Sequence, residues 1–137
     1  MDNLLWLASQ AWSVVTHFWP ISLAVLVPLL IALGLSRHVI LHIRRRAFLL
    51  LISPLLAPLF ILIWASALRH TDPHGTAPMW PQHVLYGSLI AMLPLAAFVV
   101  WRSVGHRWLA LSVSLVALWL CLCSAFVATM SLSNDWL

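Results

Sequence analysis

Four long apolar runs, separated by short breaks that hold most of the arginines, dominate this sequence. No Asp, Glu, Lys or Arg falls within any run, and each run has about 18 to 23 residues, enough to cross a hydrocarbon layer of about 30 Å as an α-helix. We therefore expect an all-α membrane protein, with residues 1–137 forming a single integral membrane domain. Its four transmembrane helices are predicted at 18–35, 47–68, 84–101 and 108–130.

The segment before the first run, residues 3–19, has the spacing of an amphipathic helix. Its apolar face is predicted to hold Leu4, Leu5, Ala8, Trp12, Val15 and Trp19, and its polar face Ser9, Gln10, Ser13, Thr16 and His17. We expect it to lie at the outer membrane interface and to turn into the first span at Pro20. The alternative is one long tilted helix in which Pro20 only introduces a kink.

The arginines predict the orientation of the chain, because positive residues accumulate on the cytoplasmic side of a membrane. Six of the seven lie in the first and third breaks, and the remaining one, Arg69, lies in the second. Both termini are then predicted to face the periplasm or exterior, as in a bacterial inner-membrane protein. The six are Arg37, Arg44, Arg45, Arg46, Arg102 and Arg107.

The first four of these arginines form a basic collar that contacts lipid headgroups or an acidic partner, unless it serves as a topology signal alone. Since the positive charge sits beside apolar spans, we assign it to the membrane and expect no nucleic-acid partner.

Prolines and small residues mark the interior of the spans. Pro28, Pro54, Pro58 and Pro94 are predicted to kink their helices, and each leaves a carbonyl that needs another donor. Small residues at four-residue spacing, which let helices approach closely, are expected at helix contacts. They are Gly87 and Ala91 in the third span and Ala117, Cys121 and Ala125 in the fourth.

Histidines offer only weak candidates for a metal or haem site. His70, His74 and His83 surround the second break with generic spacing, and bis-histidine haem would need pairs such as His17 with His83 or His42 with His106. We expect no metal and no cofactor. Cys121 and Cys123 point to different sides of a helix and are expected to pack as ordinary side chains.

The sequence contains no catalytic motif, so we expect a protein that is not an enzyme. The favoured hypothesis is a subunit or accessory partner of a membrane assembly, surrounded by the lipid bilayer and contacting other membrane polypeptides or further copies of itself. One alternative is a homo-oligomeric pore or small-molecule passage built on the proline-kinked helices. Another is a redox subunit that binds haem or metal.

Overall fold

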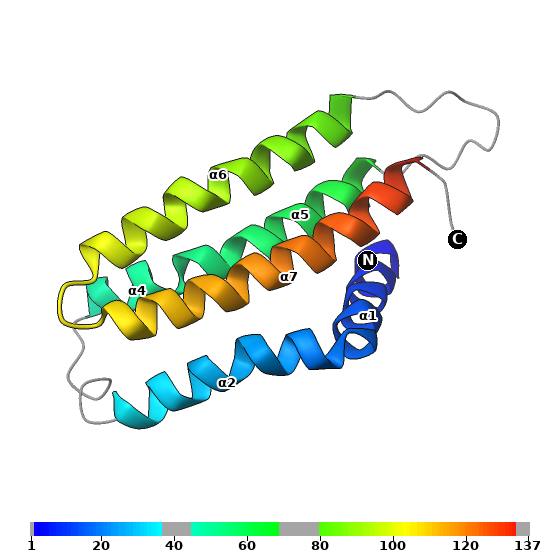
Figure 1. Cartoon of the computed structure of the whole chain (residues 1–137). Helices are drawn as coiled ribbons and strands as arrows, with labels where there is room; N and C mark the ends of the chain where they lie inside the picture. The colour runs from blue at the N-terminus through cyan, green and yellow to red at the C-terminus, as the bar shows by residue number, and fades with distance from the viewer. Residues whose placement is uncertain (1, 37–44, 69–79, 134–137) are drawn as a thin grey trace.

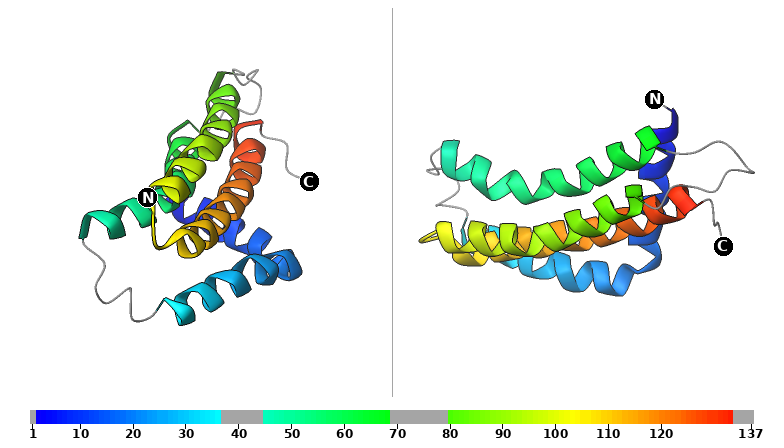
Figure 2. Two further views of the ribbon diagram at one scale, coloured as in Figure 1. Left: turned by 60° about the vertical axis from the view of Figure 1, so that its left-hand side comes forward. Right: turned by 90° about the horizontal axis from the view of Figure 1, so that it is seen from above.

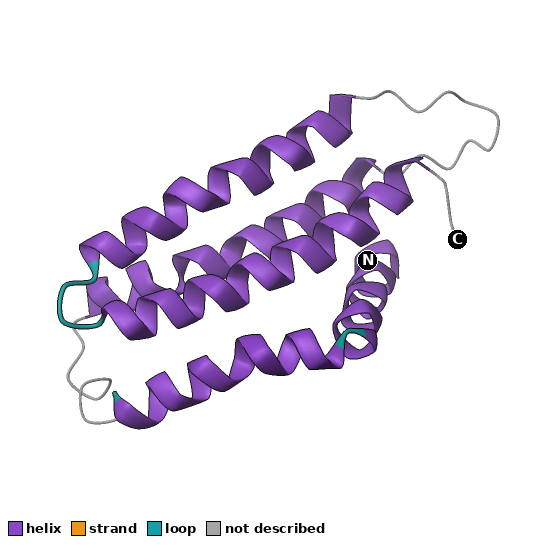
Figure 3. Ribbon diagram, in the orientation of Figure 1, coloured by secondary structure: helices purple, strands orange, loops and turns teal. Residues whose placement is uncertain are grey.

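The computed structural model describes residues 2–36, 45–68 and 80–133, and every regular element in these ranges is helical (Figures 1 and 3). This confirms the predicted all-helical class. The elements are α1 (Asp2–His17), α2 (Trp19–Leu35), α4 (Arg45–Ile52), the 3₁₀ turn η1 (Ser53–Leu55), α5 (Leu56–Leu68), α6 (Trp80–Arg102) and α7 (Arg107–Ser133).

Helix α7 is the centre of the molecule. It packs against α1, α2, α5 and α6, and 56% of its most apolar stretch is buried, against 22% for the corresponding stretches of α6 and of 47–68. Helices α5 and α2 lie on opposite sides of α7 (Figures 1 and 2), and α6 lies on the side of α7 away from α2 (Figure 1). The arrangement is therefore organised around one central helix.

The break at 102–107 is short and contains Gly105, which predicts an antiparallel helical hairpin. Helices α6 and α7 form this hairpin (Figure 1). Gly105 adopts φ +89, a left-handed conformation that glycine accepts without strain. The amide of Ser103 donates to Val99 O at 3.0 Å and that of His106 to Ser103 O at 3.0 Å. These bonds close the turn and bring α6 back along α7.

The second predicted span is interrupted at Pro54, where η1 separates α4 from α5. Proline has no amide hydrogen, so the carbonyl four residues earlier, that of Leu50, loses its helical donor. The Ser53 hydroxyl donates to this carbonyl at 2.7 Å. The amide of Leu56 is shared between Ser53 O and Pro54 O, the second of which is the carbonyl that Pro58 leaves without a helical donor. Both carbonyls are thus satisfied locally.

Helices α1 and α2 meet at a sharp corner of 89°. The break falls at Phe18, and Pro20 occupies the first turn of α2, where its missing amide hydrogen costs nothing. The alternative of one long, merely kinked helix is therefore wrong for this segment.

Within the described residues, three helical segments are long and apolar enough to cross a membrane, and α1 and α2 make a fourth if they count together as one span. These are Ala47–Leu68, Trp80–Arg102 and Arg107–Leu132. The third span begins earlier than predicted, because α6 starts at Trp80 and accepts Pro81 in its first turn. The prolines and the glycine of 72–81 predict a non-helical loop, and this prediction is wrong for Trp80 and Pro81, which are helical.

Basic residues gather at one end of the bundle. Arg45 begins α4, Arg102 ends α6 and Arg107 begins α7, and these helix ends lie together with the end of α2 (Figure 1). The start of α1 and the end of α7 lie toward the opposite end. Arg37, Arg44 and Arg69 fall outside the described residues.

Candidate functional site

A hydrogen-bonded corner fixes α1 and α2 on the central helix. The indole Nε1 of Trp119 in α7 donates to Ser22 Oγ at 3.0 Å, and this hydroxyl donates to Val15 O at 2.8 Å. Ser22 is buried, as its two bonds require in an apolar setting. Three helices are therefore joined by one serine hydroxyl.

Helix α1 presents three different faces around its axis. Leu7, Ala11 and Val14 form the stripe that packs on the bundle. About 140° away around the helix axis, Leu5 and Trp12 are 64% and 66% exposed. The polar residues Ser9, Ser13 and Thr16 follow further round.

The predicted apolar face of α1 is thus not the face that packs on the bundle. Leu5, Ala8, Trp12 and Trp19 are exposed, and the Leu7 stripe takes the buried position. The reason is that apolar residues cover more than half of the helix circumference. Periodicity alone could not separate a bundle-facing sector from a lipid-facing one.

A cleft of about 250 Å³ lies beneath α1, between α5 and α7. Helix α1 contributes Ala8, Ala11, Trp12 and Val15, all small or apolar. The remaining walls are Leu55, Pro58, Leu59 and Leu62 of the second span and Leu120, Cys123 and Ser124 of α7. The cleft is an apolar recess without a charged group in its lining.

The four span prolines do not surround a common cavity. Pro54 is buried and Pro58 lines the cleft beneath α1, whereas Pro28 and Pro94 are exposed on α2 and α6. The Ser112 hydroxyl donates its single proton mainly to Trp108 O at 2.9 Å, and Pro28 O lies at the longer distance of 3.4 Å from the same hydroxyl.

Another recess, of about 300 Å³, lies between α5 and α6 at the depth of η1. Ser53 and Ser88 line it, but both hydroxyls donate to carbonyls of their own helices, at 2.7 Å each. Ala57 and Ala91 supply further lining. The surface offered to a passing solute is therefore essentially apolar.

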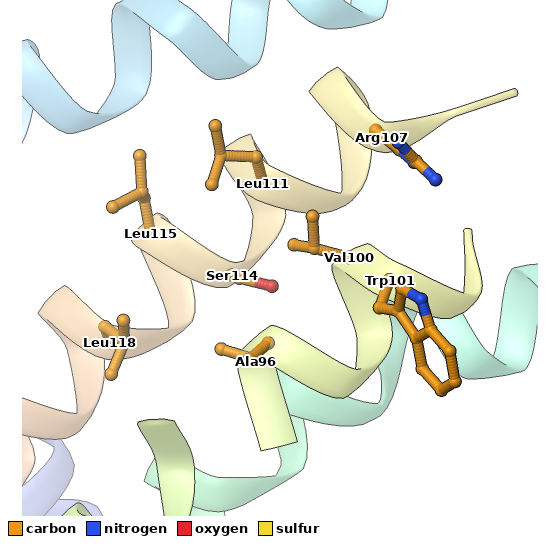
Figure 4. A pocket seen from close by; sticks show the side chains of 9 residues that line it. Ala96, Val100, Trp101, Arg107, Leu111, Ser114, Leu115 and Leu118 are labelled. Atoms are coloured by element: carbon orange, nitrogen blue, oxygen red, sulfur yellow. The ribbon is translucent and has the colours of Figure 1, made fainter. Parts of the chain in front are cut away.

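A groove of about 450 Å³ runs between α6 and α7 near the arginine end (Figure 4). Arg107 and Trp101 stand at its mouth, and Ala96, Val100, Leu111 and Leu118 line its apolar part. Ser114 is 2% exposed, and its hydroxyl has no hydrogen-bond partner in the described part of the chain. Figure 4 shows its oxygen turned toward Ala96 and Val100.

The small residues of the two hairpin helices have different surroundings. Ala117, Cys121 and Ala125 of α7 are buried in the main core cluster. Gly87 and Ala91 of α6 are exposed, and a Cβ added at Gly87 would meet nothing within 4 Å. The α6 pair is thus left to lipid or to another polypeptide.

The three described histidines, His17, His83 and His106, belong to α1, to α6 and to the turn before α7. His17 ends α1, where its ring meets Phe18 edge-on at 5.4 Å, and His83 is an exposed residue of α6. Over 2–36, 45–68 and 80–133, no group of three or more His, Cys, Asp or Glu is arranged to hold a metal. His38, His42, His70 and His74 fall outside these ranges. The side chains of Arg45 and Arg46 are likewise not described.

The sequence pattern does not distinguish Ser22, Ser114 or Trp119 as functional residues. Trp119 carried one available signal: it is the only tryptophan expected at mid-membrane depth, where its N–H needs a partner. Nothing local to Ser22 or Ser114 distinguishes them from the other serines of the spans.

The chain was compared with protein-family models, with curated proteins and with solved structures, and no match was found in any of the three.

Proposed function

We propose that this chain is a non-enzymatic subunit or accessory partner of a membrane assembly, and that it receives a transmembrane helix of another polypeptide beside α7. The observation that supports this most directly is the open placement of α2. Only Ser22 and Ala32 of its 17 residues are buried, and its extensive contacts are with α1 and α7.

The surface beside α7 has the character of a helix-docking site. Helices α2 and α5 both pack on α7. Helix α1 crosses the face of α7 between them, toward the end of α7 that is opposite the arginines (Figures 1 and 2). The cleft beneath α1 is lined by apolar and small residues, which permit close approach of a further helix within a bilayer.

The proposal places α1 at the outer interface and makes α2 the fourth span. The cleft beneath α1 reaches Ser124, about 24 Å along α7 from Trp108. With the radius of α1 added, the distance from Trp108 to the axis of α1 is close to the 30 Å thickness of a hydrocarbon core. The exposed apolar residues of α1 then enter the membrane while its polar sector meets water. The arginine end faces the cytoplasm, as in a bacterial inner membrane.

Site-specific photo-crosslinking in the native membrane tests the docking surface. A photoreactive amino acid at Leu59, which lines the cleft, is expected to trap a second polypeptide as a discrete band. The matched control is Leu93, which is equally apolar and 60% exposed but belongs to α6. No band from Leu59, or equal bands from both positions, would contradict the proposal. A band at twice the mass of the chain would identify self-association instead of a separate partner.

A further inference from the structure

The groove between α6 and α7 has features that the docking proposal does not use. Its interior is apolar, its mouth carries the Arg107 guanidinium, and it contains a buried hydroxyl that has no partner among the described residues. We propose that this groove binds an anionic phospholipid, with the headgroup at Arg107 and an acyl chain between the two helices.

The charge at the mouth selects an anion. Arg102 and Arg107 are both exposed, and the only acidic residue in the described helices, Asp2, begins α1 toward the opposite end of the bundle. Arg107 is also the first residue of α7, so the unpaired amides of that helix start add to the attraction for a phosphate. Trp101 beside it is suited to the headgroup level of a membrane.

The interior of the groove matches an acyl chain. Val100, Leu111, Leu115 and Leu118 provide an apolar track that leads away from Arg107 toward the membrane centre. The open side of the groove admits a chain laterally from the bilayer, so no passage through the protein is needed.

Ser114 supplies the second polar contact. It lies seven residues from Arg107, about 10 Å along the helix, and its hydroxyl is buried without a partner among the described residues. A hydroxyl in apolar surroundings is stabilised when it gains an acceptor. In a phospholipid the ester carbonyl lies between the phosphate and the acyl chain. With the phosphate at Arg107, this carbonyl is the acceptor that lies toward Ser114.

Lipid titration of the purified full-length chain, followed by native mass spectrometry, tests this site. The probes are phosphatidylglycerol and phosphatidylcholine with identical acyl chains. We expect preferential retention of phosphatidylglycerol and about fivefold weaker binding in Arg107→Gln, the loss associated with one basic residue near a membrane surface. Arg69→Gln, in the loop that the charge pattern places on the opposite side, should leave the affinity unchanged. Equal effects of the two substitutions would overturn the proposal.

Two further variant pairs separate a built site from general lipid contact. Leu115→Trp should obstruct the groove and displace phosphatidylglycerol, whereas Leu122→Trp, on an exposed part of α7 outside the groove, should not. Ser114→Ala should weaken retention of phosphatidylglycerol. Ser131→Ala removes another buried hydroxyl of α7 that has no partner among the described residues, and it should leave retention of phosphatidylglycerol unchanged. Wild-type retention in both Leu115→Trp and Ser114→Ala would also overturn the proposal.

Discussion

Trp119 and Ser22 lie 97 residues apart in the sequence, yet the indole Nε1 of one donates to the hydroxyl of the other at 3.0 Å. Because the same hydroxyl reaches Val15 O, this contact links the central helix to both arms of the α1–α2 corner. These two hydrogen bonds hold α1 and α2 at the angle they adopt on either side of the break at Phe18.

Ser22→Ala should lower the free energy of unfolding by about 0.5–2 kcal/mol, because the Trp119 N–H and the Val15 carbonyl both lose a buried partner. The measurement is unfolding in mixed micelles with increasing SDS. Ser9→Ala is the control, since its hydroxyl is exposed and bonds within its own helix. A Ser22 variant as stable as the Ser9 variant would show that packing alone holds the corner.

Ser53 and Pro54 should be energetically coupled. Ser53→Ala removes the donor to Leu50 O and is expected to cost about 1–2 kcal/mol. In a Pro54→Ala background, residue 54 regains an amide that can serve this carbonyl, so the same serine substitution should become nearly neutral. A double-mutant cycle measures the coupling. Additive effects would contradict the proposed role of the hydroxyl.

Cys121 should tolerate a smaller side chain better than a larger one. Its side chain is 0% exposed in the main core cluster, so Cys121→Leu is expected to cost about 1–3 kcal/mol through overpacking. Cys121→Ala should have a smaller effect. Ala24→Leu, which enlarges an exposed residue of α2, is the control. Unfolding free energies check all three, and wild-type stability in Cys121→Leu would refute the tight packing.

The recess between α5 and α6 should exclude water. Single cysteines at Ser53, Ala57 and Ala91, in a background without Cys121 and Cys123, are expected to resist small hydrophilic thiol reagents. The two native hydroxyls there already bond to backbone carbonyls. A cysteine at Ser9, on the polar sector of α1, should react. Labelling at all three recess positions would favour the pore hypothesis.

The arginine distribution predicts an orientation that reporter fusions can measure. A reporter active only in the periplasm should function after Leu137 or within 72–81 and should fail within 44–46. Replacing Arg44, Arg45 and Arg46 together should disturb insertion more than replacing Arg69, because most of the charge bias lies in the first break. Periplasmic activity from the 44–46 fusion would invert the proposed topology.

Local chemistry in the sequence accounts for many elements of the fold. The uninterrupted apolar runs predicted the membrane helices, Pro20 predicted the turn into α2, and the short link before Arg107 predicted the α6–α7 hairpin. Each of these features depends on a short stretch of sequence: the length of an apolar run, the missing amide hydrogen of a proline, or the length of a link between helices. Pro81 shows the limit, since a proline is compatible with a loop and equally with the first turn of a helix.

The sequence alone therefore determined that the chain is helical, that its apolar helices can cross a membrane, and where most of them begin and end. Only the tertiary structure decided that α7 is central, that Leu7 rather than Trp12 faces the bundle, and that Ser22 meets Trp119. The physical reason is that nearly every face of these helices is apolar. The hydrophobic pattern therefore indicates only that the helices suit an apolar environment. Which helices pack together depends on the shapes of their side chains and on a few buried hydroxyls.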